Sequence, residues 1–251
     1  MTAPEALAGL PRPEMLRLDE TALFLDLDGT LADIEPRPDQ VVAEPGRTRL
    51  LARLAEALGG RLAVVSGRAL GDIDRILDGA VPALAGVHGL QRRRADGSVA
   101  SVEPPAGLDE ARRALIAGLP AREGLLVEDK GVAVAVHYRQ APDCAAQVAA
   151  LCRATADRFG LERQPGDMVV ELRPPGADKG DAIEAFMSEP PFRGAIPIFV
   201  GDDLTDENGF RAVRGLGGYG VLVGPQRKTL AARRLGSVDE VMAWLEEALK
   251  R

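Results

Sequence analysis

Residues 24–34 read FLDLDGTLADI, an apolar run that ends in two aspartates spaced by one leucine and followed by glycine and threonine. Because side chains alternate along an extended strand, Asp26 and Asp28 would leave the same face and repel each other. In an open α/β sheet, the functional crevice lies outside the carboxyl ends of the strands. The stretch therefore predicts a β-strand that delivers two carboxylates to a functional site.

Short apolar runs alternate with amphipathic stretches around this segment, a pattern typical of a parallel sheet flanked by helices. In the first part of the chain, strands are expected at 21–29, 61–68 and 82–89, and helices at 46–60 and 69–79. The same texture resumes near the C-terminus, with helices at 178–189, 204–215 and 238–249 and strands at 195–203 and 218–224. Successive right-handed βα units predict an open, doubly wound sheet.

The middle of the chain has a different sequence pattern. Residues 91–103 place Asp-Gly between two polar arms, which is a hairpin signal. Two strands are expected within 125–139, a long amphipathic helix at 141–160 and a further strand at 167–174. Such hairpins with one or two helices indicate a separate α+β module. We therefore expect an α/β protein whose doubly wound parallel-sheet core (1–89 and 174–251) is interrupted by an inserted α+β cap domain (90–173).

Composition narrows the function classes. Of the 251 residues, 46% are hydrophobic and 27% charged, as in an ordinary globular protein. An aromatic content of 4% and a net charge of -7 argue against nucleic-acid and acidic-membrane partners. The sequence shows no signal peptide and no long apolar run, and Cys144 and Cys152 lie too far apart along a helix to bridge. We expect a cytoplasmic monomer that acts on a small molecule.

Three predicted strands end in polar residues that should meet at one edge of the sheet. These endings carry Asp26 and Asp28, then Ser66, then Asp202 with Asp203. Crowded carboxylates raise one another's pKa unless a cation neutralises them, and an all-oxygen site suits Mg²⁺. The convergence predicts a magnesium site.

This arrangement is suited to phosphoryl transfer. Asp26 could attack phosphorus and form an aspartyl-phosphate, while Asp28 protonates the leaving oxygen and then activates water. The phosphate also needs ligands, because phosphoryl transfer depends on positioning and charge stabilisation. The hydroxyl of Ser66, backbone N–H groups near Gly67 and the ammonium of Lys179 could supply them.

At this point the chain resembles a known superfamily. The segments DLDGTL (26–31), SGR (66–68), Lys179 ahead of its helix and GDDLTDE (201–207), in this order, are similar to the four motifs of haloacid dehalogenase (HAD) phosphatases. Within that superfamily, SGR, VEDKGVAVAVHYRQAP (127–142) and MVVELRPPGADKG (168–180) closely resemble the trehalose-6-phosphate phosphatases. The resemblance covers about residues 21–224 and implies Mg²⁺-dependent hydrolysis of trehalose 6-phosphate to trehalose and phosphate.

The resemblance also implies residue roles. It makes Asp26 the nucleophile and Asp28 the general acid/base. The implied metal ligands are Asp26, the backbone carbonyl of Asp28, and Asp202, with Asp203 and Asp206 supporting them. The implied phosphate ligands are Ser66, Gly67 and Lys179. The implied substrate-binding residues are Arg68 in the core and Glu128, Lys130 and Glu171 in the cap.

Several alternatives stay open from the residues alone. The core motifs would serve equally a phosphatase for sucrose phosphate, mannosylglycerate phosphate or a monosaccharide phosphate, because specificity lies in the cap. A signalling receiver domain also phosphorylates an aspartate beside Mg²⁺, but Asp28 and the insertion argue against it. A catalytically silent sugar sensor would have lost a core motif, and none is lost. His88 and His137 are too few for a zinc site, and the run at 91–94 is interpreted as a solvated charge run.

Overall fold

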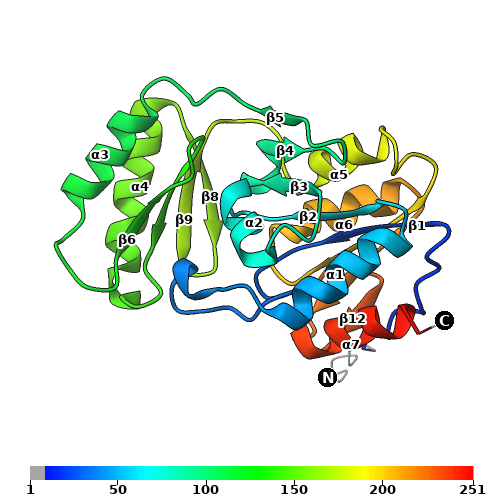
Figure 1. Ribbon diagram of the computed structural model, residues 1–251. Helices are drawn as coiled ribbons and strands as arrows, with labels where there is room; N and C mark the ends of the chain where they lie inside the picture. The colour runs from blue at the N-terminus through cyan, green and yellow to red at the C-terminus, as the bar shows by residue number, and fades with distance from the viewer. Residues whose placement is uncertain (1–8, 251) are drawn as a thin grey trace, which may run out of the picture.

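The computed structural model describes residues 9–250. Its main sheet has eight strands in the order β12-β11-β10-β1-β2-β3-β4-β5 (Figure 1). Six strands are parallel: β1 (Thr21–Leu25), β2 (Leu62–Val65), β3 (Ala83–Gly86), β10 (Ile196–Gly201), β11 (Tyr219–Val223) and β12 (Arg233–Leu235). The two others, β4 (Gln91–Arg93) and β5 (Val99–Ser101), are antiparallel. The doubly wound α/β prediction is confirmed, with a mixed rather than purely parallel sheet.

Helices cover both faces of this sheet, which explains why its strands read as unbroken apolar runs. One face packs against α1 (Pro45–Ala57), α2 (Leu70–Leu77) and α7 (Val238–Ala248), through a cluster that includes Leu51, Ile73 and Trp244. The other face packs against α5 (Lys179–Met187) and α6 (Asp206–Gly215). The two hydrophobic layers fix the sheet, so its carboxyl edge is a rigid platform.

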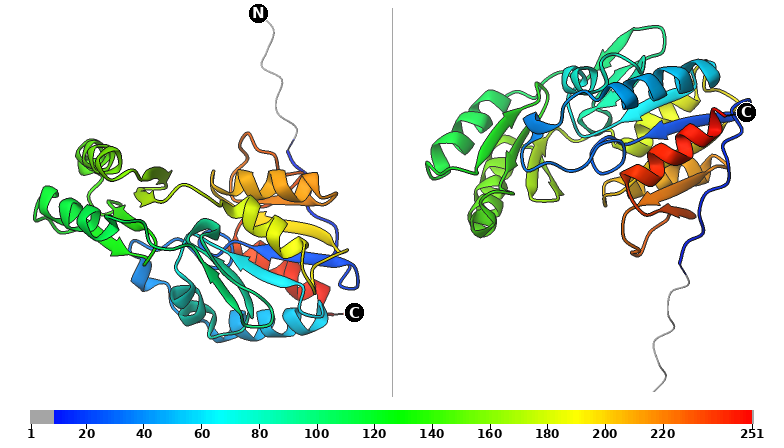
Figure 2. Two further views of the ribbon diagram at one scale, coloured as in Figure 1. Left: turned by 90° about the horizontal axis from the view of Figure 1, so that it is seen from above. Right: turned by 60° about the horizontal axis from the view of Figure 1, so that its bottom comes forward.

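A second, smaller sheet lies beside the first (Figure 2). Its four antiparallel strands run in the order β6 (Leu126–Asp129), β7 (Val134–His137), β9 (Val169–Arg173), β8 (Glu162–Gly166). Helices α3 (Leu108–Gly118) and α4 (Ala145–Phe159) cover one face, because alternate strand residues such as Val134, Val136 and Leu172 pack against them. The opposite face of these strands is turned toward the main sheet.

The hairpin at 91–103 is a correction. It was expected to belong to the inserted module, but its first strand pairs with β3 and extends the core sheet. The arginines of the charge run are also not simply solvated, because they are partly buried and paired: Arg93 forms a bidentate ion pair with Asp74, and Arg92 and Arg94 share Glu189. These pairs hold the hairpin on the core. The division into domains stays a prediction, with the start of the insert moved beyond Ser101.

Other differences are smaller. Helix α3 and the short strands β8 and β12 were not predicted from the sequence. Cys144 and Cys152 are both buried free thiols, as expected. No helix within residues 9–250 has the length and apolar character needed to cross a membrane.

Candidate active site

A cavity of about 350 Å³ separates the carboxyl ends of β1, β2 and β10 from the second sheet. This volume is in the range of small-molecule sites. Every site residue proposed from the sequence lines the cavity except Asp206, which lies beneath it and is fully buried. The topology explains the convergence, because β10, β1 and β2 are neighbours in the sheet. The predicted meeting of three strand endings is confirmed.

The floor of the cavity is a buried ion cluster. The ammonium of Lys179 lies 3.0 Å from Oδ1 of Asp26 and 2.6 Å from Oδ1 of Asp206. Lys179 is held in place as the first residue of α5, because the N-cap residue Asp178 accepts hydrogen bonds from the N–H groups of Gly180 and Asp181. Lys179 thus enters the site from a fixed helix end.

Both carboxylate oxygens of Asp206 accept hydrogen bonds that hold the site together. Oδ1 accepts from Lys179, and Oδ2 accepts from the backbone N–H groups of Asp202 and Asp203, each at 2.9 Å. One carboxylate oxygen from each of Asp26, Asp202 and Asp206 lies within 4.8 Å of the other two. Because three hydrogen bonds already engage Asp206, Asp26 and Asp202 are the carboxylates with more oxygen sites free for a metal ion.

The electrostatics of the cluster favour a cation. Burial raises the pKa of Asp26 well above its usual range, and Lys179 only partly opposes this shift. Burial and the charge of Asp206 raise the pKa of Asp202 to about 7. Burial would lower the pKa of Lys179, but Asp206 and Asp26 outweigh it and hold the pKa above its ordinary value. One ammonium does not neutralise three carboxylates, so the donor set fits a hard cation.

Gly29 permits the close approach of the first strand's loop to this cluster. Its φ is 76°, and a Cβ there would lie 2.2 Å from Oδ2 of Asp202. The hydroxyl of Thr30 donates to Oδ1 of Asp202 at 3.4 Å. The packing of Asp202 against the loop therefore explains the glycine that follows Asp28.

The loop after β2 forms one wall. Ser66 is almost fully buried, and its Oγ accepts from the N–H of Arg68 at 3.2 Å. The guanidinium of Arg68 binds both carboxylate oxygens of Asp28, at 2.7 and 2.8 Å, and the carbonyl of Pro38 at 2.9 Å. In this conformation Arg68 therefore positions Asp28, and each of its three guanidinium nitrogens already donates a hydrogen bond.

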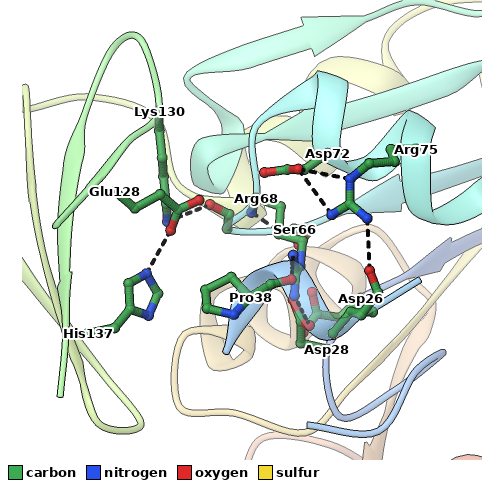
Figure 3. A network of polar contacts seen from close by, with 12 residues as sticks. Asp26, Asp28, Pro38, Ser66, Arg68, Asp72, Arg75, Glu128, Lys130 and His137 are labelled. Carbon is green, nitrogen blue, oxygen red and sulfur yellow. Dashed lines mark hydrogen bonds and ion pairs between the residues drawn. The ribbon is translucent and has the colours of Figure 1, made fainter. Parts of the chain in front are cut away.

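The facing wall comes from the second sheet (Figure 3). Glu128, Ala135 and Glu171 form one row across β6, β7 and β9, on the face opposite the helices. Lys130 donates to Oε2 of Glu171 at 2.5 Å, and His137 lies 2.6 Å from Oε2 of Glu128. The row is suited to binding hydroxyl groups through charge-assisted hydrogen bonds.

Electrostatics keep this wall ionised. Burial would raise the pKa of Glu128, but the hydrogen bond from His137 and the charge of Lys130 outweigh it and lower the pKa. Burial would lower the pKa of Lys130, and Glu171 and Glu128 more than compensate. Lys130 also donates to the carbonyl of Gly67 at 2.9 Å, which joins the second sheet to the Ser66 loop.

Two contributors were not predicted from the sequence. His137 was considered above only as a zinc ligand, yet it lines the cavity and orients Glu128; its spacing from Glu128 on paired antiparallel strands is the signal that could have identified it. Arg227 donates to the backbone carbonyls of Asp202 and Asp203 and pairs with Glu207. Nothing local in the sequence marks Arg227, because its partners precede it by about twenty residues.

Comparison with known proteins agrees with this geometry. The family model described as trehalose-phosphatase matches residues 24–237. A probable trehalose-phosphate phosphatase of Sinorhizobium fredii is 43% identical over 228 residues, which cover 90% of this chain and 85% of the relative. The trehalose-6-phosphate phosphatase of Escherichia coli is 44% identical over 230 residues, with the same coverage of 90% and 85%.

A solved structure supports the fold independently. The C-terminal domain of Candida albicans trehalose-6-phosphate phosphatase superposes with a TM-score of 0.81 at 21% identity, over 97% of this chain and 99% of that domain. At this identity the match concerns the fold, including the second sheet.

Proposed function

The chain belongs to the trehalose-phosphatase family of the HAD superfamily, and we propose that it hydrolyses trehalose 6-phosphate to trehalose and phosphate. The observation that carries this proposal is the set of residues that line one cavity. Its floor holds a buried Asp–Lys–Asp cluster suited to a phosphate and a metal, and its facing wall holds Glu128, Lys130 and Glu171, which are suited to sugar hydroxyls.

The reaction uses the cluster in two steps. An oxygen of Asp26 attacks phosphorus, the bond from phosphorus to the sugar oxygen breaks, and Asp28 gives that oxygen a proton. Asp28 then takes a proton from water, which attacks the aspartyl-phosphate and releases phosphate. Arg68 holds the Asp28 carboxylate at the wall of the cavity, and the nearly complete burial of Asp26 limits competing water.

The phosphate ligands surround the nucleophile. Lys179 lies 3.0 Å from Asp26 and supplies a positive charge at the reacting group. The Ser66 hydroxyl and the N–H groups near Gly67 supply hydrogen bonds from the wall. Together they stabilise the charge that spreads over the phosphoryl oxygens in the transition state.

Mg²⁺ is the cofactor that fits the donor set. Asp26, Asp202 and the backbone carbonyl of Asp28 would hold it, while Asp203 and Asp206 support the loop that presents Asp202. When bound, it supplies the positive charge that neutralises the carboxylates and the phosphate. Asp206 is given the supporting role because its two oxygens already accept hydrogen bonds from Lys179 and from the two backbone N–H groups.

The direct test is phosphate release from trehalose 6-phosphate with Mg²⁺ and with excess chelator. Rapid release that stops in chelator and returns on adding Mg²⁺ is expected. Release that persists in chelator would remove the metal from the mechanism, and no release from any sugar phosphate would overturn the proposed function.

Metal should also change how stability depends on pH. The Asp202 carboxyl has a pKa of about 7 in the folded chain against an ordinary value of 3.8. The folded state therefore binds a proton more tightly than the unfolded state, and the contribution of Asp202 to stability falls as pH rises from about 4 to about 7 in metal-free protein. Mg²⁺ should raise Tm more at pH 8 than at pH 5. In Asp202→Asn this difference should shrink; an equal Mg²⁺ effect at both pH values in the wild type would contradict the assignment.

The sugar-binding row should determine substrate preference. Glu128→Gln removes the charge that strengthens hydrogen bonds to sugar hydroxyls and keeps the size of the side chain. The ratio of kcat/KM for trehalose 6-phosphate to that for p-nitrophenyl phosphate should fall about 10- to 100-fold. Glu162→Gln, an exposed carboxylate at the edge of the same sheet, is the matched control and should leave the ratio at the wild-type value. Equal losses on both substrates in Glu128→Gln would refute the role of the row.

A further inference from the structure

The turn that follows β3 has a strained backbone. In the 3-10 turn η2 (Val87–Gly89), Val87 has a φ of 47° and His88 a φ of 55°. Left-handed backbone is unfavourable for a β-branched residue such as valine, and strain of this kind concentrates at functional sites. The turn is anchored to the phosphate loop, because the N–H of Val87 donates to the carbonyl of Arg68 and the N–H of His88 to the carbonyl of Ser66, each at 2.9 Å.

This backbone places the His88 ring directly against Gly67. A Cβ at Gly67 would lie 2.7 Å from Nε2 of His88, so the imidazole occupies the space that any other residue at position 67 would need. The ring also lines the cavity. Its Nε2 lies 4.0 Å from Oε2 of Glu171, which is too far for a hydrogen bond.

Glu171 carries an unused acceptor at the same place. Its side chain is 3% exposed, and Oε2 accepts from Lys130. Oε1 is buried and has no hydrogen-bond partner among the described residues. Because an unpaired buried carboxylate oxygen is costly, a missing donor is indicated. Nε2 of His88 lies 4.0 Å from the other oxygen, Oε2, of the same carboxylate, and one oxygen atom about 2.8 Å from both Nε2 and Oε2 would fit between the ring and the carboxylate.

The surroundings of His88 keep its ring neutral. Burial lowers its pKa well below the ordinary value, and the positive charges of Lys179, Lys130 and Arg173 lower it further. A neutral imidazole has one N–H donor and does not compete as a cation with Lys130 for Glu171. It can therefore donate a hydrogen bond to an uncharged oxygen.

We infer that His88 and Glu171 bind one hydroxyl of the substrate sugar together, with the hydroxyl donating to the Glu171 carboxylate and accepting from the N–H of His88. This inference rests on the proposed sugar-phosphate phosphatase function and adds His88 as a specificity-determining residue. It also gives the glycine of the SGR motif a physical reason, since only glycine lets the ring reach this position.

The test compares two substrates in His88→Asn, because asparagine tolerates left-handed backbone and its shorter side chain does not reach the hydroxyl. The ratio of kcat/KM for trehalose 6-phosphate to that for p-nitrophenyl phosphate should fall about 5- to 20-fold. Ser101→Ala, an exposed residue of the β4–β5 hairpin that lies outside the cavity lining, is the control. It should leave both rates and their ratio unchanged.

A double-variant cycle tests whether the two residues share one hydroxyl. In the Glu171→Ala background, His88→Asn should change the ratio less than about 2-fold. The inference is overturned if His88→Asn lowers both substrates equally, or if it lowers the ratio by the same factor with and without Glu171. If the wild type prefers a different sugar phosphate, the proposed substrate is wrong, and the same ratio measured with the preferred ester still decides the role of His88.

Discussion

Asp26→Asn is expected to lower phosphate release by about 10⁴-fold or more while the protein stays folded. An amide cannot form the aspartyl-phosphate, although it matches the carboxylate in size. The substitution should not destabilise the metal-free protein. Burial raises the pKa of Asp26 well above its ordinary value, so the ionised carboxylate is itself unfavourable in the fold. Without metal, Tm should equal or exceed that of the wild type.

Two measurements make this prediction specific. Phosphate release is followed with a saturating sugar phosphate and Mg²⁺, and thermal unfolding is followed in chelator. Asp33→Asn, an exposed aspartate of the same segment, is the matched control and should keep wild-type activity. Substantial turnover by Asp26→Asn in a preparation free of deamidated protein, with Asp26→Ala equally active, would refute the nucleophile assignment.

Lys179→Met should cost both activity and stability. The side chain is 3% exposed and pairs with two buried carboxylates, so its loss leaves Asp26 and Asp206 without a cation. Removing one partner of a buried ion pair costs about 3–5 kcal/mol. Because the ammonium also faces the phosphate, a fall of about 10³-fold in kcat is expected. Denaturant unfolding and steady-state kinetics measure the two losses separately.

The double variant Lys179→Met/Asp206→Asn separates the two roles of the lysine. Removing both partners should restore part of the stability, because the uncompensated buried charge is gone. Activity should stay low, because the phosphate still lacks its cation. Lys228→Met, an exposed lysine, is the control and should be neutral in both assays. Recovery of activity in the double variant would show that Lys179 acts only through the fold.

The floor of the site could be predicted from the sequence because its residues follow apolar strands directly. Asp26, Ser66 and Asp202 each follow a strand that is buried, apart from the first residue of β10, and the order of parallel strands brings such ends together. The resemblance to HAD phosphatases supplied the remaining residues, including Glu128 and Glu171. Pattern alone would have left these two as surface charges.

The errors arose where pairing partners are distant in sequence. The 91–94 run looked solvated because Glu189, which binds Arg92, lies 97 residues away. Helix α3 has Gly107 at its N-cap and no side-chain cap, so the usual start signal is missing. Strand β8 contains Pro165, which is tolerated only because β8 is an edge strand. These features depend on tertiary context, which local patterns do not contain.

Two of the proposed substrate-binding residues make more contacts than their motifs suggested. Lys130 was predicted as a sugar ligand, and it additionally bonds Glu171 and the carbonyl of Gly67. Arg68 was predicted as a substrate ligand, and its guanidinium holds Asp28 and the carbonyl of Pro38 within the core. Lys130 ties the second sheet to the Ser66 loop, so binding of the sugar and positioning of the phosphate loop are physically linked.

The most direct test of the central claim is an internal competition. Equimolar trehalose 6-phosphate, sucrose 6-phosphate and glucose 6-phosphate are mixed with the wild-type protein and Mg²⁺, and the loss of each ester is followed in the same tube. The ratio of the decay rates gives the ratio of kcat/KM values without any correction for enzyme quality. We expect trehalose 6-phosphate to be consumed first, by a factor of about 100 or more if several charge-assisted hydrogen bonds distinguish it. Equal consumption of the three esters, or faster loss of either rival, would contradict the assignment.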